Sequence, residues 1–172
     1  LQPSDLNLYV LDFGSRALGT LAELPHCGGV FTPEQPELVE RTFARIERTI
    51  AERKAMLGQR GFTSIDEARN SGVSLPYVVL MIDGYAAFNS TYQLVDHGEM
   101  NDRLVKILSD GRSVGVTVVL TADRRNAVPT AVSSLVPQRL VMRMGEIDEY
   151  VSLGLSGDLG RTEIAPGRAF LQ

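Results

Sequence analysis

Apolar runs alternate along the chain with segments in which apolar side chains recur every three or four residues. Leu6–Phe13 and Val116–Thr121 are short runs rich in strand-forming residues, and Tyr77–Ile82 is apolar throughout. Runs of this length, without polar alternation, indicate strands that are covered on both faces. We therefore expect three buried strands in these segments.

One helix is predicted between the first two of these strands in chain order. Its apolar positions follow steps of four, three, four and seven residues, at Val39, Phe43, Ile46, Ile50 and Leu57. Thr32, followed three residues later by Gln35, predicts a capping box at its start. Gly58 or Gly61 is expected to end it.

The remaining elements are shorter. The pattern predicts a strand at Val30–Phe31, one helical turn within the loop Phe62–Leu75, a helix over Glu99–Val114, a strand around Leu140–Met142, a short helix over Asp148–Leu155 and a terminal strand at Ala169–Leu171. Strands that alternate with helices around apolar central strands predict a three-layer α/β fold with a mostly parallel sheet.

Composition narrows the class of protein. The 172 residues carry 17 basic and 21 acidic side chains, and 44% of them are hydrophobic, which excludes a disordered chain and suits one domain. The net charge of −4 argues against a general nucleic-acid clamp. Cys27 is the single cysteine, so no internal disulfide forms and a reducing cytoplasmic compartment is expected. No apolar run reaches the length of a membrane span.

Polar residues follow two of the predicted strands. Asp83 lies at the carboxyl end of a buried strand, where α/β sheets bind ligands and where an acid can orient magnesium beside phosphates. Thr121 follows the neighbouring strand, and Arg124 and Arg125 come next. The alternative is structural: Asp83 opens a turn before Gly84, and the arginines belong to a solvated turn.

The remaining motifs and polar residues do not predict a catalytic or binding site. The sequence contains no GxxxxGK[ST] phosphate loop, and neither Lys54 nor Lys106 follows a suitable glycine pair, so tight nucleotide binding by this chain alone is not expected. His26 is interpreted as a packed turn residue and Cys27 as a small apolar one. The arginines of the long helix are interpreted as a solvated face; they are Arg41, Arg45, Arg48 and Arg53.

In order along the chain, five stretches resemble the motor domain of the FtsK/SpoIIIE family, and within it the ATPase modules of EccC type from type VII secretion. They are LYVLDFGSRALGTLAELPHCGGV, RTIAERKAML, PYVVLMIDGYAAF, GRSVGVTVVLTADRRNAVP and APGRAFLQ. The resemblance implies a RecA-like P-loop NTPase core, with residues 1–172 as one module that starts after its phosphate-loop helix. About 60–80 further residues would hold the missing strand, loop and helix.

The same resemblance implies roles for particular residues. Asp83 would be the magnesium-side acid, Thr121 a sensor-like residue, and Arg124 and Arg125 would face the phosphate or a neighbouring subunit. ATP and Mg²⁺ are the cofactors expected in the intact module, and none is expected on this fragment alone.

Departures from the family pattern imply a degenerate module without catalytic residues of its own. Where active motors have Asp-Glu, this chain has Asp83-Gly84, and glycine has no base to activate water. A glutamate in place of Gly84 is therefore expected to recover turnover. The Ala-Thr-Gln of DNA motors is replaced around Thr121, and Tyr150 occupies the place of an arginine.

The expected function is nucleotide-dependent assembly and recognition of secreted substrates with little or no hydrolysis. The expected partners are other ATPase modules of the same protein, in a hexameric ring, and secreted proteins. This domain would be the cytoplasmic part of a membrane-associated protein, without membrane or DNA contact of its own. The alternatives are a DNA translocase module of the same family, and a nucleotide-free α/β interaction domain.

Overall fold

The computed structural model describes residues 1–161 and 165–172, and the chain divides into two compact units, Leu1–Ala122 and Asp123–Gln172. The first unit contains β1 Leu6–Asp12, β2 Cys27–Phe31, α1 Pro36–Arg60, α2 Ile65–Asn70, β3 Tyr77–Asp83, α3 Tyr85–Val95, α4 Glu99–Gly111 and β4 Val116–Leu120. The second contains α5 Thr130–Ser133, β5 Leu140–Val141, α6 Ile147–Ser152 and β6 Phe170–Leu171. Short 3₁₀ turns lie at Leu18–Glu23, Arg112–Val114, Arg125–Ala127 and Gly157–Arg161.

A four-stranded sheet in the order β2-β1-β3-β4 forms the centre of the first unit, and every neighbouring pair is parallel. The register of β1 and β3 runs from Leu6 opposite Tyr77 to Asp12 opposite Asp83. All four strands therefore end at the same edge of the sheet. The α/β class, the parallel sheet and the three main predicted strands are confirmed.

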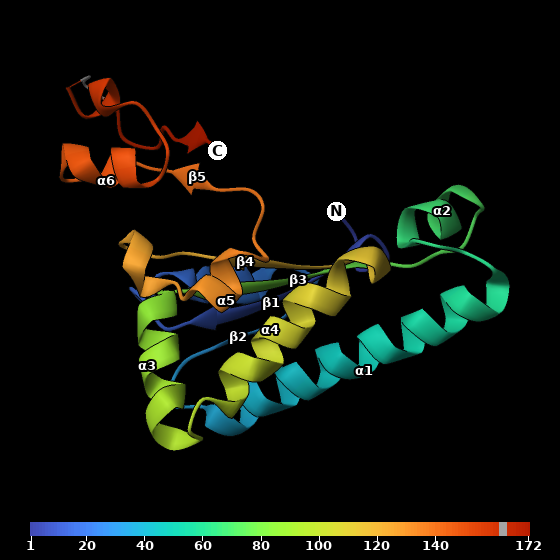
Figure 1. Cartoon of the computed structure of the whole chain (residues 1–172). Helices are drawn as coiled ribbons and strands as arrows, with labels where there is room; N and C mark the ends of the chain where they lie inside the picture. The colour runs from blue at the N-terminus through green and yellow to red at the C-terminus, as the bar shows by residue number, and fades with distance from the viewer. Residues whose placement is uncertain (162–164) are drawn as a thin grey trace. The chain divides into compact units, whose positions relative to one another are not determined.

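Helices α1, α3 and α4 lie on one side of this sheet (Figure 1). In β3 the side chains alternate: Val78, Leu80 and Ile82 are buried, whereas those between them are partly exposed. In β4, Val119 is 42% exposed. Cover on both faces is confirmed for β1, in which residues 8–12 are all buried. It is incomplete for β3 and wrong for β4, because no described element of the first unit covers the second face of β4 completely.

Helix α1 buries the predicted stripe, from Val39 to Leu57. It begins at Pro36, later than the capping box predicts. The Gln35 side-chain oxygen does accept a hydrogen bond from the Thr32 amide (3.2 Å), one of the two bonds of that capping box, but this bond closes the turn before the helix. Gly61, with φ of +73°, ends the helix in the left-handed conformation that glycine adopts without strain.

Arg53 is not part of a solvated face. Its side chain is buried and donates hydrogen bonds to the carbonyl oxygens of Val114 (2.8 Å) and Pro76 (2.6 Å). These carbonyls lie just before β4 and β3, so the guanidinium ties α1 to the starting ends of two strands. Arg41, Arg45 and Arg48 are exposed, as predicted.

A second arginine joins two helices on the same side of the sheet. Arg103 of α4 pairs with Glu40 and Glu47 of α1 and lies over the ring of Phe43, 5.5 Å from its centroid. The hydrogen bonds to the two glutamates raise the pKa of Arg103, with Glu47 as the largest cause. The guanidinium therefore keeps its charge and cross-links α1 to α4.

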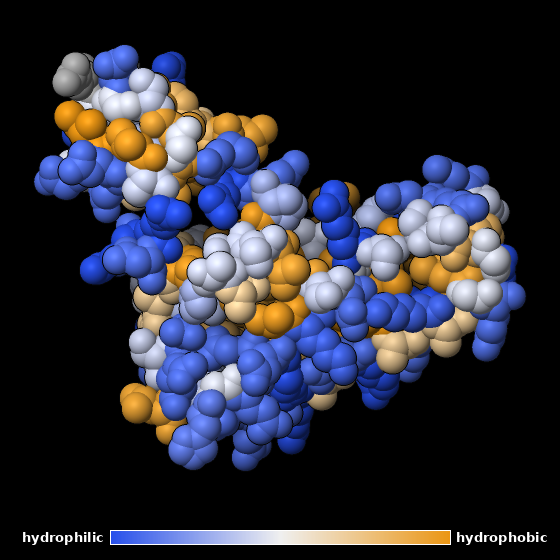
Figure 2. Space-filling view, in the orientation of Figure 1, coloured by the Kyte–Doolittle hydropathy of each residue, from blue (hydrophilic) through white to orange (hydrophobic). Residues whose placement is uncertain are grey.

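The second unit has a small core of its own around Val141 and Tyr150. The two short predicted strands are present as β5 and β6, but they pair with each other, antiparallel. Figure 2 shows hydrophobic side chains gathered over α6 and β5, and large apolar residues of this unit are more than a third exposed: Leu140, Met142, Ile147, Val151 and Leu171.

Helix α3 has no counterpart among the predicted elements. Its buried aromatic residues are Tyr85, Phe88 and Tyr92. The Phe13 ring contacts those of Phe88 and Tyr92, whose own centroids lie 4.9 Å apart. No helix among the described residues is long and apolar enough to span a membrane.

We predict that Arg53→Met lowers the free energy of unfolding by about 2–4 kcal/mol, because two buried carbonyls lose a charged donor. Urea unfolding followed by circular dichroism measures the change. Arg48→Met is the matched control: it lies on the same helix and is exposed, and it should change stability by less than about 0.5 kcal/mol. Equal effects of the two variants would contradict the role assigned to Arg53.

Candidate functional site

The carboxyl ends of β1, β3 and β4 are joined by backbone hydrogen bonds. The Phe13 amide donates to the Asp83 carbonyl (2.9 Å), and the Thr121 amide donates to the Ile82 carbonyl (3.0 Å). The Tyr85 amide donates in turn to the Thr121 carbonyl (2.9 Å). These bonds fix the places from which side chains project at the ligand-binding edge of a parallel sheet.

Asp83 and Thr121, two of the predicted site residues, are in contact. The Thr121 hydroxyl donates to Oδ1 of Asp83 (2.8 Å) and accepts from the Gly84 amide (2.9 Å). A hydroxyl has one proton, and here it is directed at the carboxylate. Thr121 therefore orients Asp83 in this structure, and the same proton is not available to a phosphate.

Two glycines bring the chain close to that carboxylate. A Cβ at Gly14 would lie 2.2 Å from Oδ2 of Asp83, and a Cβ at Gly84 would lie 2.8 Å from both the Cα and the nitrogen of Gly14. Gly84 has φ of +73°, which disfavours any side chain. This backbone therefore opposes a glutamate at position 84, and the effect of such a change on turnover stays a prediction.

Asp12 lies at the end of β1, opposite Asp83, and was not predicted as a site residue. Its side chain is 1% exposed, and its two oxygens accept hydrogen bonds from the amides of Arg16 (3.0 Å) and Leu18 (3.1 Å). The sequence signal was available, since Asp12 follows a buried strand just as Asp83 does. Its buried carboxylate holds the turn that carries Gly14.

Arg124 and Arg125 begin the second unit, whereas Asp83 and Thr121 belong to the first. The Arg124 guanidinium hydrogen-bonds the adjacent Asp123 carboxylate (3.1 Å), which lowers the pKa of Asp123. Arg125 is exposed and has no ion-pair partner among the residues that the structure describes. Their predicted contact with phosphate or a neighbouring subunit stays a prediction.

The site can supply oxygen ligands but not a complete metal centre. Within residues 1–161 and 165–172, no three His, Cys, Asp or Glu side chains come together. A carboxylate and a hydroxyl are oxygen groups of the kind that Mg²⁺ prefers, and Mg²⁺ usually completes its shell with water and substrate phosphates. The Asp83–Thr121 pair therefore fits one side of a magnesium–phosphate complex.

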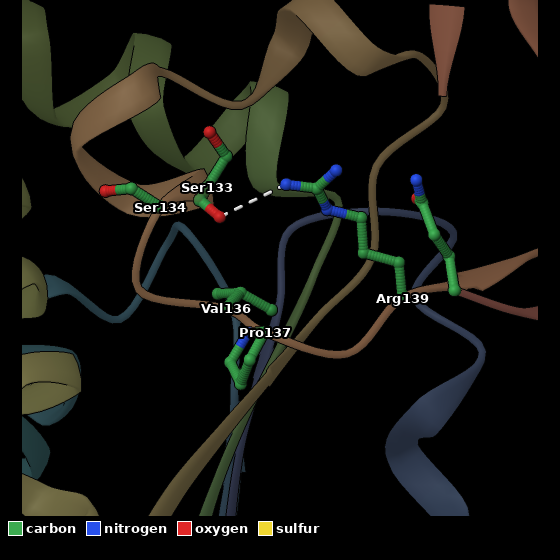
Figure 3. Close-up of a pocket in the computed structure, with 6 residues that line it drawn as sticks. Ser133, Ser134, Val136, Pro137 and Arg139 are labelled. Atoms are coloured by element: carbon green, nitrogen blue, oxygen red, sulfur yellow. Dashed lines mark hydrogen bonds between the residues drawn. The ribbon is translucent and has the colours of Figure 1, made fainter. Parts of the chain in front are cut away.

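The other candidates use residues that do not belong to these strand ends. The carbonyl of His26 accepts the Leu8 amide (2.8 Å), consistent with its interpretation as a turn residue, and Cys27 is a half-buried residue of β2. A pocket of about 290 Å³ lies within the second unit, where Arg139 donates to the Ser133 carbonyl at 3.2 Å (Figure 3). None of the predicted site residues lines it.

Comparison with known proteins identifies the sequences and folds to which the chain is similar. The sequence profile of the FtsK/SpoIIIE family matches residues 1–162. The type VII secretion system protein EssC of Staphylococcus aureus (strain MRSA252) is 26% identical over 153 residues, which are 88% of this chain and 10% of EssC. The chain therefore spans about a tenth of the length of this curated relative.

Two solved structures of Thermomonospora curvata EccC have a similar fold, each with a TM-score of 0.82, 26% identity and 98% of this chain covered. One is "EccC (ATPases 2 and 3) in complex with a signal sequence peptide", of which the match covers 30%. The other is the "Cytoplasmic domain of the Thermomonospora curvata Type VII Secretion ATPase EccC", of which it covers 20%.

We predict that Gly84→Ala lowers the free energy of unfolding by about 1–3 kcal/mol or more. A residue with a side chain is strained at this positive φ, and the new Cβ would also clash with the Gly14 backbone. Thermal and urea unfolding of the purified chain measure it. Gly58→Ala, within α1 and with open space around its Cβ, should instead stabilise by about 0.5–1 kcal/mol. An unchanged free energy of unfolding in Gly84→Ala would contradict the close approach of the Gly84 and Gly14 backbones.

Proposed function

Because the chain belongs to the FtsK/SpoIIIE family, we propose that it is an ATPase module of a type VII secretion motor whose nucleotide serves assembly and substrate recognition, with little or no hydrolysis. The observation that carries the proposal is the hydrogen-bonded pair of Asp83 and Thr121 at the carboxyl ends of neighbouring parallel strands. The similarity to EssC and EccC supports the secretion role.

Asp83 is assigned as the magnesium-side acid of the intact module. Its Oδ1 is held by Thr121, and Oδ2 accepts no hydrogen bond among the described residues, so no described donor competes there with a cation or its water. Magnesium would neutralise phosphate charge at this place. Thr121 contributes by fixing the direction of the carboxylate.

The phosphate loop is proposed to come from a further strand that pairs with β4. Within the first unit, β4 pairs only with β3, and its sequence Val116–Leu120 is uncharged and rich in β-branched residues. Such an edge promotes association with other strands unless it is covered. A parallel strand added there would bring its carboxyl end, and the loop after it, beside Thr121 and Asp83.

Hydrolysis is not expected because the position next to Asp83 has no base. Gly84 lacks a side chain, and its positive φ and its contact with Gly14 oppose the introduction of one. A general base must lie within hydrogen-bond reach of the attacking water. Bound nucleotide would therefore act as a structural ligand that stabilises the module and its contacts.

The partners follow from the relatives. An EccC structure was solved with a signal sequence peptide, which supports recognition of secreted proteins by modules of this type. Another structure is of the cytoplasmic domain of EccC, which supports the proposal that this chain is a cytoplasmic domain of a membrane-associated protein. The exposed apolar side chains of the second unit, such as Leu140 and Leu171, fit a surface that neighbouring modules cover in a ring.

We predict that this chain alone shows no ATP binding in titration calorimetry, because the loop that holds the phosphates is missing. The module joined to its phosphate loop should bind Mg·ATP with negligible hydrolysis, and Asp83→Ala should weaken that binding at least about tenfold. Micromolar ATP affinity of the chain alone would overturn the proposal. So would rapid hydrolysis by the unmodified module that Asp83→Ala abolishes.

We predict that Arg124→Ala combined with Arg125→Ala weakens assembly or nucleotide retention of the intact protein at least about tenfold, because an interfacial charge loses its partner. Arg125→Ala should carry most of the effect, since Arg124 already pairs with Asp123. Analytical ultracentrifugation measures assembly, and Arg41→Ala with Arg48→Ala is the control pair on exposed helix surface. Unchanged assembly, nucleotide binding and secretion would show that the two arginines are only a solvated turn.

A further inference from the structure

We propose that Gly14 and Asp12 are positioning residues for Asp83: Asp12 fixes the turn after β1, and that turn holds the bare backbone of Gly14 against the Asp83 carboxylate. The inference rests on the proposed function only where it assigns a magnesium role to Asp83. The contact itself is a property of this chain without any ligand.

The Asp83 carboxylate is confined from two sides. Oδ1 accepts the Thr121 hydroxyl at 2.8 Å, and a Cβ on Gly14 would lie 2.2 Å from Oδ2 and 3.0 Å from Cγ. These distances are far below van der Waals contact. With any other residue at position 14, the carboxylate would have to turn away, and its hydrogen bond to Thr121 would lengthen or break.

Backbone conformation does not explain the glycine at position 14. Gly14 is not among the glycines with positive φ, so its φ does not by itself require glycine. The nearest atoms that a Cβ would meet are Oδ2 and Cγ of Asp83, whereas the Gly84 amide is at an ordinary 3.5 Å. The requirement for glycine thus comes from the Asp83 side chain.

The turn that presents Gly14 is held under strain. Arg16 has φ of +59°, a left-handed conformation that is costly for a residue with a side chain. Three contacts maintain it: the amides of Arg16 and Leu18 donate to the buried Asp12 carboxylate, and the Arg16 guanidinium pairs with Glu34. Strain maintained in this way concentrates at functional sites. Asp12 therefore acts on Asp83 through the turn and does not touch a ligand.

The first experiment is a double-mutant cycle on the purified chain, without nucleotide. Gly14→Ala should raise the unfolding equilibrium constant about threefold to tenfold, the loss expected for one displaced hydrogen bond. In an Asp83→Ala background the same change should have less than about a twofold effect, because the clashing carboxylate is gone. Gly19→Ala, five residues further on and with nothing near its Cβ, is the matched control.

If Gly14→Ala alone does not fold, the cycle still gives an answer, because the double variant with Asp83→Ala must then recover folding. Additive effects, or an unfolded double variant, would overturn the positioning role. Asp12→Asn, which keeps the shape of the side chain but replaces one acceptor by a donor, should weaken the coupling between Gly14 and Asp83 in the same cycle.

The second experiment uses the module joined to its phosphate loop and compares ATP affinity with and without Mg²⁺. Gly14→Ala should reduce the affinity gained from Mg²⁺ at least about fivefold, with little change in the Mg²⁺-free affinity. A purely structural role would lower both together. If Mg²⁺ strengthens binding and Gly14→Ala leaves that gain intact, the positioning inference fails. If Mg²⁺ does not strengthen ATP binding although the double-mutant cycle shows coupling between Gly14 and Asp83, the metal role of Asp83 is wrong and the contact between these two residues is still supported.

Discussion

The contact between the backbone of Gly14 and the side chain of Asp83 is the constraint on which the candidate site depends. Two parallel strands end in register, Asp12 opposite Asp83, and the chain after each must turn within the same small space. A side chain at Gly14 would meet the Asp83 carboxylate, and a side chain at Gly84 would meet the backbone of Gly14. The sheet can therefore present one carboxylate here, oriented by Thr121, only because both turns lack a Cβ.

The helices keep that edge in place from the opposite end of the sheet. Arg53 joins α1 to the carbonyls that precede β3 and β4, and Arg103 joins α4 to α1 through two glutamates. These guanidiniums are satisfied by groups far away in sequence, and none of their partners lies at the site. The scaffold and the site thus use separate sets of charged groups, so a variant at Asp83 should leave the helix contacts intact.

The pattern of apolar residues predicted those strands and helices whose formation depends on residues close together in sequence. Apolar runs indicated β1, β3 and β4, and the spacing from Val39 to Leu57 indicated α1, because both signals depend on neighbours in sequence. Helix α3 was missed since it starts after Gly84 in a left-handed conformation, without the Ser, Thr or Asp that usually marks a helix start. Arg53 was misassigned because its partner carbonyls lie 23 and 61 residues away.

At the site, the sequence predicted that Asp83 and Thr121 end neighbouring strands, but it did not predict the hydrogen bond between them, and it missed Asp12. Strand ends followed by Asp83 and Thr121 were sufficient to bring the two together at one sheet edge, because parallel strands share that edge. The role of Thr121 follows from its single hydroxyl proton. The hydroxyl donates its one hydrogen bond to Asp83 and accepts one from the Gly84 amide. A residue committed in this way reports on phosphate only when it gives up the carboxylate. If Thr121 has the proposed sensor-like role, sensing and orienting would therefore be alternative states of one hydroxyl, and a magnesium ion bound at Asp83 would decide between them.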